Sequence, residues 1–226
     1  MDDRNFDQQT AQAWINAVEK PGKSWRDDHV YSKLNHLIHE TSPKTILDIG
    51  CGQGICCEKV KLSQCTYTGI EPSPFLLDRA KQLYSSRDKI FLPGNAYDLP
   101  VPNQSFDAAF SILVWHLLMD IEKASSELSR VLAKNGHFLI VTANPDAYSA
   151  WKSLYFDAKL TGNKLEGTMR LGEALSQDVL YLHTFNEIKK SLQNVGLNIE
   201  HTETFSPKSE SPELKMLILI QGKKYN

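Results

Sequence analysis

The stretch Leu47-Asp48-Ile49-Gly50-Cys51-Gly52-Gln53-Gly54 is a short apolar run that ends in three spaced glycines. The apolar residues from Ile46 to Ile49 are typical of a buried parallel strand. Glycine at positions 50 and 52 allows the chain to turn sharply and brings backbone N–H groups within reach of a ligand. We therefore expect a strand, a tight ligand-binding turn and the start of a helix.

Two details of this turn indicate which ligand it binds. The dinucleotide fingerprint places its third glycine three positions after the second, whereas Gly54 follows Gly52 by two. Asp48, just before the turn, would repel a pyrophosphate and attract an ammonium group. Glu71 ends the next predicted strand, 21 positions after Gly50, where a carboxylate suits two ribose hydroxyls. The pattern favours a nucleoside with a cationic amine, although Glu71 alone does not separate NAD from other adenosine ligands.

Outward from this turn, strand-like and helix-like patterns alternate along the chain. Strands are expected at 45–49, 66–70, 89–92, 106–113, 137–142, 197–205 and 214–221. Helices are expected at 73–83, at 121–132 with Asn135-Gly136 closing the turn, and after the capping-box pattern Thr184-x-x-Glu187. The alternation predicts an α/β fold with a doubly wound, mainly parallel sheet and helices on both faces. A Ser/Pro-rich turn before the last strand predicts that this strand is antiparallel.

We expect a single domain over residues 1–226, because no repeat, low-complexity tract or linker interrupts it. Residues 1–43 contain two amphipathic helical patterns and should form an N-terminal helical cap. Residues 44–145 hold the alternating core that binds the ligand. The alternation of strand and helix patterns ends there. Residues 146–183 contain aromatic helical pieces and a glycine-containing stretch, and they should form an insertion or lid. Residues 184–226 should form a C-terminal helix and a strand hairpin.

Composition excludes several protein classes. The 226 residues carry 25 Lys and Arg against 27 Asp and Glu, without the basic excess of a dedicated nucleic-acid binder. The longest aliphatic run, 216–220, is far short of the roughly 20 residues of a membrane span. The acidic, polar start resembles neither a signal nor a transit peptide, which predicts a cytoplasmic protein. Cysteines 51, 56, 57 and 65 have no CxxC spacing and no histidine among them, so we expect free buried thiols and no metal.

Several ordered motifs together resemble the class I S-adenosylmethionine (SAM)-dependent methyltransferases, near their type 11 small-molecule group. The similar segments are Asp48–Gly54 for the D-x-G-x-G-x-G motif, Glu71 for the ribose acid, 94–107 for the adenine loop and the segment after it, and 127–136 for the helix and turn before the fifth strand. The similarity to the family extends over residues 44–145, and a weaker similarity is present at 181–200. Ordered motifs at the right spacing are far more specific than one glycine loop.

The resemblance implies a seven-stranded Rossmann-like methyltransferase fold, with SAM as cofactor and S-adenosylhomocysteine as product. It assigns Gly50, Cys51, Gly52 and Gly54 to the methionine end with Asp48 facing it, Glu71 and Pro72 to the ribose, Asn95 and Ala96 to the adenine, and Ser111 and Leu113 to the wall near the sulfonium. The family usually has an acid where Asn95 stands. An asparagine oxygen still accepts a hydrogen bond from the adenine amine, so binding need not be lost.

The end of the fourth predicted strand, Ser111–His116, bears on the methyl acceptor. It lacks the Asn/Asp-Pro-Pro-Tyr/Phe element shared by methyltransferases of bases and glutamine, so O- or C-methylation of a small organic molecule is favoured. His116 and His183 are the candidate catalytic residues that orient or deprotonate the acceptor, the alternative being that each only packs or hydrogen-bonds. The predicted substrate residues are Trp25, Arg26, Tyr31, Trp115, Trp151 and Tyr155. For the aromatic residues the alternative is a role as helix-packing anchors, and for Arg26 it is an ordinary surface position.

Three other functions are weighed against this one. An RNA-modifying methyltransferase would bind with a steep salt dependence, but the near-neutral charge speaks against it. A SAM-binding sensor or inactive partner would keep Asp48, Gly50, Gly52 and Glu71 without turnover. An NAD enzyme fits the glycine spacing poorly. The expected partner is a small-molecule acceptor rather than nucleic acid or a membrane, and the protein is expected to be a monomer or homodimer.

Overall fold

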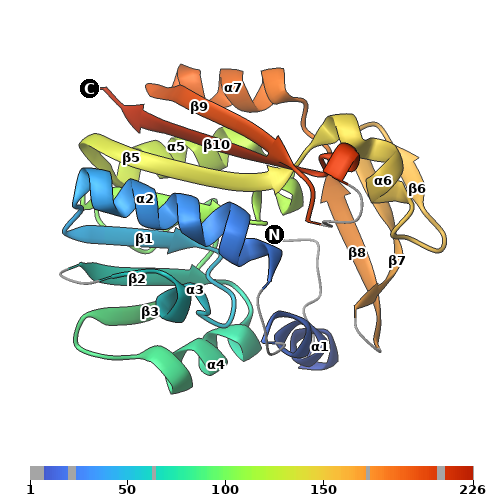
Figure 1. The fold of residues 1–226 in the computed structure, drawn as a ribbon, viewed down its shortest axis with the longest axis horizontal. Coiled ribbons are helices and arrows are strands. Elements are labelled where there is room, and N and C mark those ends of the chain that lie inside the picture. Colours follow the sequence, from blue (N-terminus) through green and yellow to red (C-terminus); the bar gives the residue numbers. More distant parts are fainter. Residues whose placement is uncertain (1–7, 20–23, 63–64, 172–173, 208–211, 226) are drawn as a thin grey trace.

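The computed structural model describes residues 8–19, 24–62, 65–171, 174–207 and 212–225. Its main body is a seven-stranded sheet in the order β3-β2-β1-β4-β5-β10-β9 (Figure 1). The strands are β1 (Thr45–Ile49), β2 (Thr66–Glu71), β3 (Lys89–Pro93), β4 (Phe106–Ile112), β5 (Leu132–Ala143), β9 (Leu197–Phe205) and β10 (Leu217–Lys224). Strands β1 to β5 pair in parallel, and β10 is antiparallel to both β5 and β9. The predicted sheet and its antiparallel last strand are confirmed.

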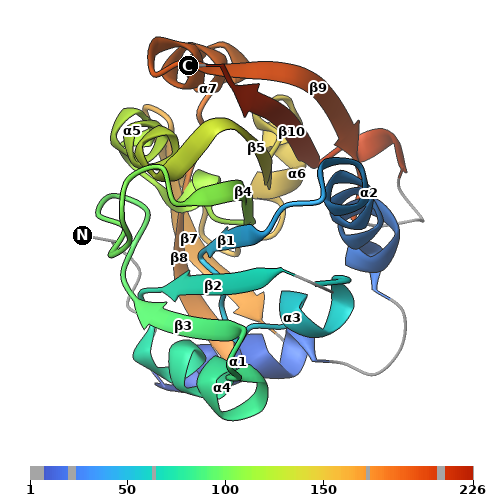
Figure 2. The ribbon, with the colours of Figure 1, turned by 90° about the vertical axis from the view of Figure 1, so that its left-hand side faces the viewer.

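Helices cover both faces of this sheet, as predicted (Figure 2). On one face the helices are α2 (Ser32–Thr41), α3 (Cys56–Lys59) and α4 (Pro74–Tyr84), and on the other α5 (Ile121–Val131) and α7 (Phe185–Asn194). Tyr67 and Phe110 are fully buried in the first layer, and Leu128 and Phe138 in the second. All four cysteines are free and buried in the first layer, as the sequence predicts.

The start of α7 is where the sequence places it, but the end of α5 is not. The Thr184 hydroxyl accepts a hydrogen bond from the Glu187 N–H (3.2 Å), and the Glu187 carboxylate accepts one from the Thr184 N–H (2.7 Å). Helix α5 ends at Val131, because the fully buried Leu132 already pairs with β4 as the first residue of β5. Asn135, predicted to close the helix, takes a left-handed φ of 63° where the register between β4 and β5 shifts.

The insertion after β5 differs from the predicted helical pieces. Among the residues of the insertion that the structure describes, helical structure is limited to a 3₁₀ turn at Pro145–Ala147 and α6 (Tyr148–Lys152). An antiparallel sheet follows, made of β6 (Lys159–Thr161), β7 (Lys164–Leu171) and β8 (Ala174–Tyr181). Leu165 and Leu180 lie opposite each other in the β7–β8 pair and are buried with Leu117 and Tyr155. This apolar cluster holds the small sheet at the carboxyl edge of the main sheet (Figure 1).

The two predicted N-terminal helices are present but do not form one layer. Helix α1 (Gln8–Val18) packs on α4, β7 and β8, with Ala11 and Ile15 against Leu76. Helix α2, preceded by a π-helical turn at Asp27–Tyr31, packs on the main sheet. Helix α1 and the small sheet thus stand beside the carboxyl ends of the central strands (Figures 1 and 2). Among the described helices, none has both the length and the apolar character that a membrane crossing needs.

Candidate active site

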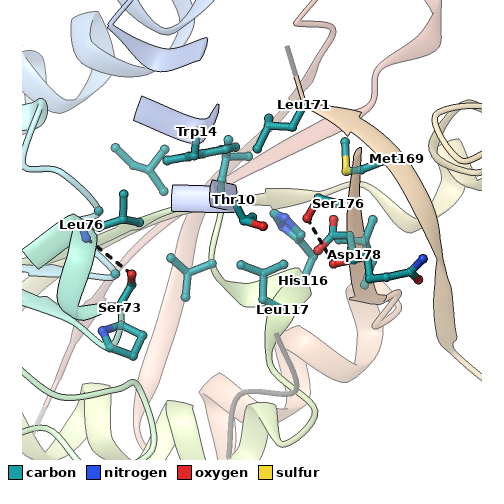
Figure 3. A pocket seen from close by; sticks show the side chains of 18 of the residues that line it. Thr10, Trp14, Ser73, Leu76, His116, Leu117, Met169, Leu171, Ser176 and Asp178 are labelled. Carbon is teal, nitrogen blue, oxygen red and sulfur yellow. Dashed lines mark hydrogen bonds between the residues drawn. The ribbon is translucent and has the colours of Figure 1, made fainter. Parts of the chain in front are cut away.

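A cavity of about 450 Å³ lies between the carboxyl edge of the main sheet and the segments that stand over it (Figure 3). Loops after β1, β2 and β4 form one wall, and α1, α6, β7 and β8 form the other. It is lined by Thr10, Trp14, Gly50, Gly52, Glu71, Pro72, Ser73, Pro74, Leu76, Ile112, Leu113, Val114, His116, Leu117, Trp151, Leu154, Tyr155, Met169, Leu171, Ser176, Gln177, Asp178 and Leu180. The strand order reverses between β1 and β4, where doubly wound sheets bind their ligands.

The cavity gathers about half of the residues predicted for the site. Those that line it are Gly50, Gly52, Glu71, Pro72, Leu113, His116, Trp151 and Tyr155. Those that the structure places elsewhere are Asp48, Cys51, Gly54, Asn95, Ala96, Ser111, Trp25, Arg26, Tyr31, Trp115 and His183.

The glycine turn presents its backbone to the cavity. Gly50 and Gly52 have φ angles of 77° and 55°, in the left-handed region that glycine adopts at no steric cost. A Cβ at Gly50 would lie 2.3 Å from Val114 Cγ2, so no side chain fits there. A Cβ at Gly52 would meet only Trp14 Nε1, at 3.9 Å, and would take up space in the cavity. The turn therefore forms a cradle that a ligand can approach closely.

Glu71 ties the end of β2 to this turn. Its Oε2 accepts a hydrogen bond from the Gly52 N–H and its Oε1 one from the Ser73 N–H, both at 2.9 Å. A carboxylate has about four lone-pair sites, so it still has acceptor capacity for two ligand hydroxyls. Pro72 lines the cavity beside it. The glycine cradle and this carboxylate fit the amino-acid end and the ribose of a SAM-like nucleoside.

Asp48 lies beneath the turn instead of in the cavity. Its Oδ2 accepts a 2.6 Å hydrogen bond from the Tyr67 hydroxyl, and the Cys56 thiol is a further partner. Burial raises the pKa of Asp48 to about 7, although these hydrogen bonds act in the opposite direction. The carboxyl group is 1% exposed. It can affect a bound ammonium group only across the backbone of the turn.

The remaining cofactor residues predicted from the motif have structural contacts. Cys51 packs against Gly69, where an added Cβ would lie 2.7 Å from Cys51 Sγ. The Ser111 hydroxyl, 1% exposed, donates to the Ile49 carbonyl at 2.9 Å. A Cβ at Gly54 would lie about 3 Å from side-chain atoms of Tyr84, Ala80 and Phe91. These three positions shape the turn and the strand behind it.

The predicted adenine loop does not reach this cavity. The Asn95 Oδ1 accepts a 2.8 Å hydrogen bond from the Tyr97 N–H, so the side chain closes its own turn. Ala96 is buried in the layer that contains α5. Contact of either residue with adenine therefore stays a prediction.

The end of β4 forms the floor of the cavity on the acceptor side. Leu113 lines it with a left-handed φ of 62°, which is uncommon for a non-glycine residue. The Leu113 N–H donates to the Val141 carbonyl at 2.7 Å, and this bond holds the strained backbone. Backbone strain of this kind is concentrated at functional sites. Trp115 in the next turn, Trp115–Leu117, points away and is 2% exposed in the core.

His116 lines the cavity, and its contacts define its tautomer. The Nδ1 atom accepts a 3.2 Å hydrogen bond from the Ala143 N–H and lies 3.2 Å from Thr142 Oγ1. Because a backbone N–H can only donate, Nδ1 is unprotonated and the neutral ring carries its proton on Nε2. The ring also lies 5.8 Å from that of Trp151. In this state the ring is neutral and its Nε2 carries the hydrogen-bond donor.

His183 does not join His116 in the cavity. Its Nε2 donates to the Leu118 carbonyl at 2.6 Å, and its Nδ1 lies 3.4 Å from Asn163 Nδ2. Burial lowers the pKa of His183, which keeps the ring neutral. Both ring nitrogens thus serve contacts that connect the β6–β7 turn to the main body.

The predicted aromatic residues separate into two groups. Trp151 and Tyr155 line the cavity; Trp151 Nε1 donates to the Met216 carbonyl at 3.0 Å. Trp25 and Tyr31 instead pack in or against the first core layer. The Arg26 guanidinium stacks over Trp25, 4.6 Å from the ring centroid, and over Trp14 at 5.9 Å. Since Trp14 contacts the side of Gly52, Arg26 lies on the glycine-turn side of the site.

Sequence reasoning missed the wall contributed by β7 and β8. Met169, Leu171, Ser176, Gln177 and Asp178 line the cavity, together with Thr10 of α1. The sequence does carry one signal for this sheet. Gly162-Asn163 is a turn pair between two short runs with residues of high strand propensity, and Gly162 has a φ of 61°.

Comparisons with known proteins agree with this geometry. A family model described as a methyltransferase domain matches residues 47–140. Fatty-acid O-methyltransferase of Mycolicibacterium smegmatis is 29% identical over 133 residues, covering 55% of this chain and 48% of that protein. Demethylmenaquinone methyltransferase of Thermotoga maritima is 25% identical, covering 76% of this chain and 78% of that protein. The chain spans about half the length of the first curated relatives that it matches.

Solved structures share the whole fold. An S-adenosylmethionine-dependent methyltransferase from Clostridium acetobutylicum has a TM-score of 0.70 at 16% identity, covering 98% of this chain and 100% of that one. One from Mesorhizobium loti has a TM-score of 0.62 at 22% identity, covering 87% and 99%. A methyltransferase domain therefore accounts for residues 47–140, and the seven-stranded sheet with its antiparallel last strand is the fold that these solved S-adenosylmethionine-dependent methyltransferases share.

Proposed function

We propose that this protein transfers a methyl group from SAM to a small organic acceptor held between the glycine turn and the small sheet. The observation that carries the proposal is a shared cavity: Gly50, Gly52 and Glu71 line the same space as the apolar wall from α6, β7 and β8. One wall fits the cofactor, and the other is large enough and apolar enough for a second ligand.

The residues of the cofactor wall have separate tasks in this proposal. The backbone at Gly52 approaches the methionine end, and the Glu71 carboxylate accepts hydrogen bonds from the ribose hydroxyls. Arg26, stacked on Trp14 beside Gly52, balances the carboxylate of the methionine end. Because its ring partner Trp14 lies beside Gly52, Arg26 fits this role better than the predicted contact with the acceptor.

The acceptor wall supplies position and exclusion of water. Bound SAM provides a methyl group that its sulfonium already activates. Leu113 and Val114 present an apolar surface at the end of β4, and Trp151 closes the cavity from α6. His116 orients the acceptor by donating a hydrogen bond from Nε2. Holding the reacting groups in line in a dry site is enough to account for a large share of the rate.

O- or C-methylation is the chemistry that this arrangement supports. The end of β4, from Ser111 to His116, has no Asn/Asp-Pro-Pro-Tyr/Phe element to receive the amino group of a base or of glutamine. Ile112, Leu113 and Val114 line the cavity there and offer no polar side chain. An acceptor with a C–H or O–H acidic enough to lose its proton to solvent before transfer therefore fits the site better than an exocyclic amine.

Calorimetry with SAM, S-adenosylhomocysteine and NAD tests the cofactor. Both adenosyl ligands should bind, and Glu71→Ala should weaken them by roughly tenfold or more, since it removes an acceptor for charge-assisted hydrogen bonds. Glu40→Ala is the matched control, because Glu40 is an exposed carboxylate at the end of α2. Binding of NAD in preference to SAM, or of none of the three, would contradict the proposal.

Turnover separates the enzyme from the other candidates. Release of S-adenosylhomocysteine with a panel of small hydroxyl and acidic C–H compounds supports a small-molecule methyltransferase. SAM binding without transfer to any of them favours a sensor or an inactive partner. Tight RNA binding that falls steeply with salt would favour an RNA-modifying enzyme.

A further inference from the structure

The loop between β3 and β4 is held by two charged side chains of α5. The Arg130 guanidinium donates hydrogen bonds to the Leu99 carbonyl (2.8 Å), the Val101 carbonyl (2.9 Å) and Asn103 Oδ1 (2.7 Å). The Glu127 carboxylate accepts one from the Leu99 N–H at 2.7 Å. The middle of the loop is therefore fixed to α5, beside which it runs (Figure 2).

These two side chains also orient each other. Arg130 Nε donates to Glu127 Oε1 at 2.7 Å, and its Nη2 donates to Oε2 at 2.8 Å. The paired hydrogen bonds raise the pKa of Arg130 and lower the pKa of Glu127, so both groups stay charged. A planar guanidinium presents its donors in a fixed fork, which lets it serve the carboxylate and the loop together, and lysine has no such fork.

The same loop packs against the end of β2 that carries Glu71. Its first residue, Gly94, donates its N–H to the Glu71 carbonyl at 3.4 Å. A Cβ at Gly94 would lie 2.7 Å from Pro100 Cδ, so the proline ring lies directly on the Gly94 backbone. Pro100 stands between the two residues whose carbonyls accept from Arg130. A continuous chain of contacts thus runs from α5 through Pro100 to the backbone of Glu71.

The order of the sheet places this loop on the base side of a bound nucleoside. The strands follow the order β3-β2-β1, so the glycine turn after β1 and the loop after β3 flank the end of β2. In the proposed function Glu71 binds the ribose and the glycine turn binds the methionine end. The base is attached at C1′, across the ribose ring from the carbon that carries the methionine end. It therefore extends toward the loop after β3.

We propose that Arg130, oriented by Glu127, is a positioning residue that sets the affinity for the base of the cofactor by holding the loop after β3 against Glu71. The inference rests on the proposed function, because it places a SAM-like nucleoside at Glu71. Arg130 does not line the cavity, so it acts through the loop and touches no ligand itself. A hydrogen-bonding edge discriminates between bases only when its supporting contacts hold it in place.

Two ligands that differ only in the base test this role: S-adenosylhomocysteine and S-inosylhomocysteine, in which an oxygen replaces the amine at C6. Each is titrated by calorimetry into the full chain. We expect the adenosyl ligand to bind about tenfold tighter, or more. Arg130→Lys keeps the charge but loses the fork, so it should weaken the adenosyl ligand by about fivefold or more and reduce the preference to about threefold or less. Glu127→Gln should act in the same direction, because one amide oxygen replaces the two carboxylate oxygens that serve Arg130 and the Leu99 N–H.

Arg87→Lys is the matched control, because Arg87 is an exposed arginine in the turn before β3, at the other end of that strand from the loop. It should leave both affinities unchanged. Thermal unfolding of each variant identifies a role in stability alone: a lower unfolding temperature of Arg130→Lys with the full base preference retained overturns the proposal. An unaltered chain that binds both ligands equally overturns it as well. If Arg130→Lys does not fold, Glu127→Gln decides on the same criteria. Failure of the unaltered chain to bind S-adenosylhomocysteine would contradict the proposed function instead.

Discussion

The Gly52 N–H donates a 2.9 Å hydrogen bond to Glu71 Oε2, joining the turn after β1 to the end of β2 across 19 positions of sequence. The same carboxylate holds the Ser73 N–H at the start of α4. One side chain therefore organises both the glycine cradle and the ribose side of the site. Its loss should affect folding and binding together.

We expect Glu71→Gln to lower the free energy of unfolding by about 1–3 kcal/mol, because the amide has one acceptor oxygen for two N–H donors, one buried and one partly buried. Urea unfolding measures this change, and calorimetry with SAM measures the parallel loss of affinity. Glu40→Gln in α2 is the control. Unchanged stability and affinity would show that Glu71 does not organise the turn.

Two glycine substitutions should separate folding from binding. Gly50→Ala places a methyl group 2.3 Å from Val114 Cγ2 and should destabilise the fold by about 1–3 kcal/mol through overpacking and a strained φ. Gly52→Ala meets nothing closer than 3.9 Å, so it should fold with a smaller loss and yet block SAM. Gly162→Ala, also at positive φ but in open space, is the control for strain alone. Normal SAM affinity of Gly52→Ala would argue against the cradle.

The buried carboxyl of Asp48 should make stability depend on pH. Its pKa is about 7 in the folded protein against 3.8 as the ordinary value, so the folded state holds a proton that the unfolded state releases. Deprotonation of Asp48 therefore lowers the free energy of unfolding as the pH rises from about 4 to about 7. The decrease is up to roughly 1.4 kcal/mol per pH unit. Asp48→Asn should remove this contribution. Urea titrations of both proteins at pH 5 and pH 8 measure it, and equal pH dependence would contradict it.

His116 and His183 should respond differently to substitution. Asparagine reproduces the position of Nδ1 and glutamine that of Nε2. We expect His116→Gln to retain more turnover than His116→Asn, because the acceptor contact depends on the Nε2 donor, while both bind SAM normally. Turnover is measured with the acceptor that the panel identifies. The reverse order would show that the contact with Ala143 matters more than donation to the acceptor.

His183 should act on stability. His183→Ala leaves the buried Leu118 carbonyl without its 2.6 Å partner, at a cost of about 1–3 kcal/mol, with turnover per folded molecule unchanged. Burial lowers the pKa of His183 below its ordinary value of 6.5. The unfolded state therefore binds the proton more readily, and this contribution to stability is lost as pH falls through about 6.5. A loss of turnover larger than the loss of folded protein would indicate a role in the reaction.

Local patterns predicted the core of the fold well. Each strand of the main sheet overlaps its expected range, although β5 begins at Leu132 instead of 137 and β10 spans Leu217–Lys224 instead of 214–221. Thr184 and Glu187 form the capping box that their spacing predicts. The insertion was harder, since β7 and β8 are half-exposed strands whose burial depends on Leu117 and Tyr155 from elsewhere in the chain. The helix ending at Val131 was misplaced because pairing with β4 overrides the Asn135-Gly136 signal.

The alternating core, the glycine turn and the acidic end of β2 are predictable from local sequence, because they depend on spacing and on residues close along the chain. Which side chains share the cavity depends on packing between elements that are distant in sequence. Strand β1 is buried on both faces after its first residue, so no alternation shows that Asp48 points toward Tyr67. Thr10 and Asp178 meet the same cavity from α1 and β8 because packing, which no local pattern encodes, brings those elements together.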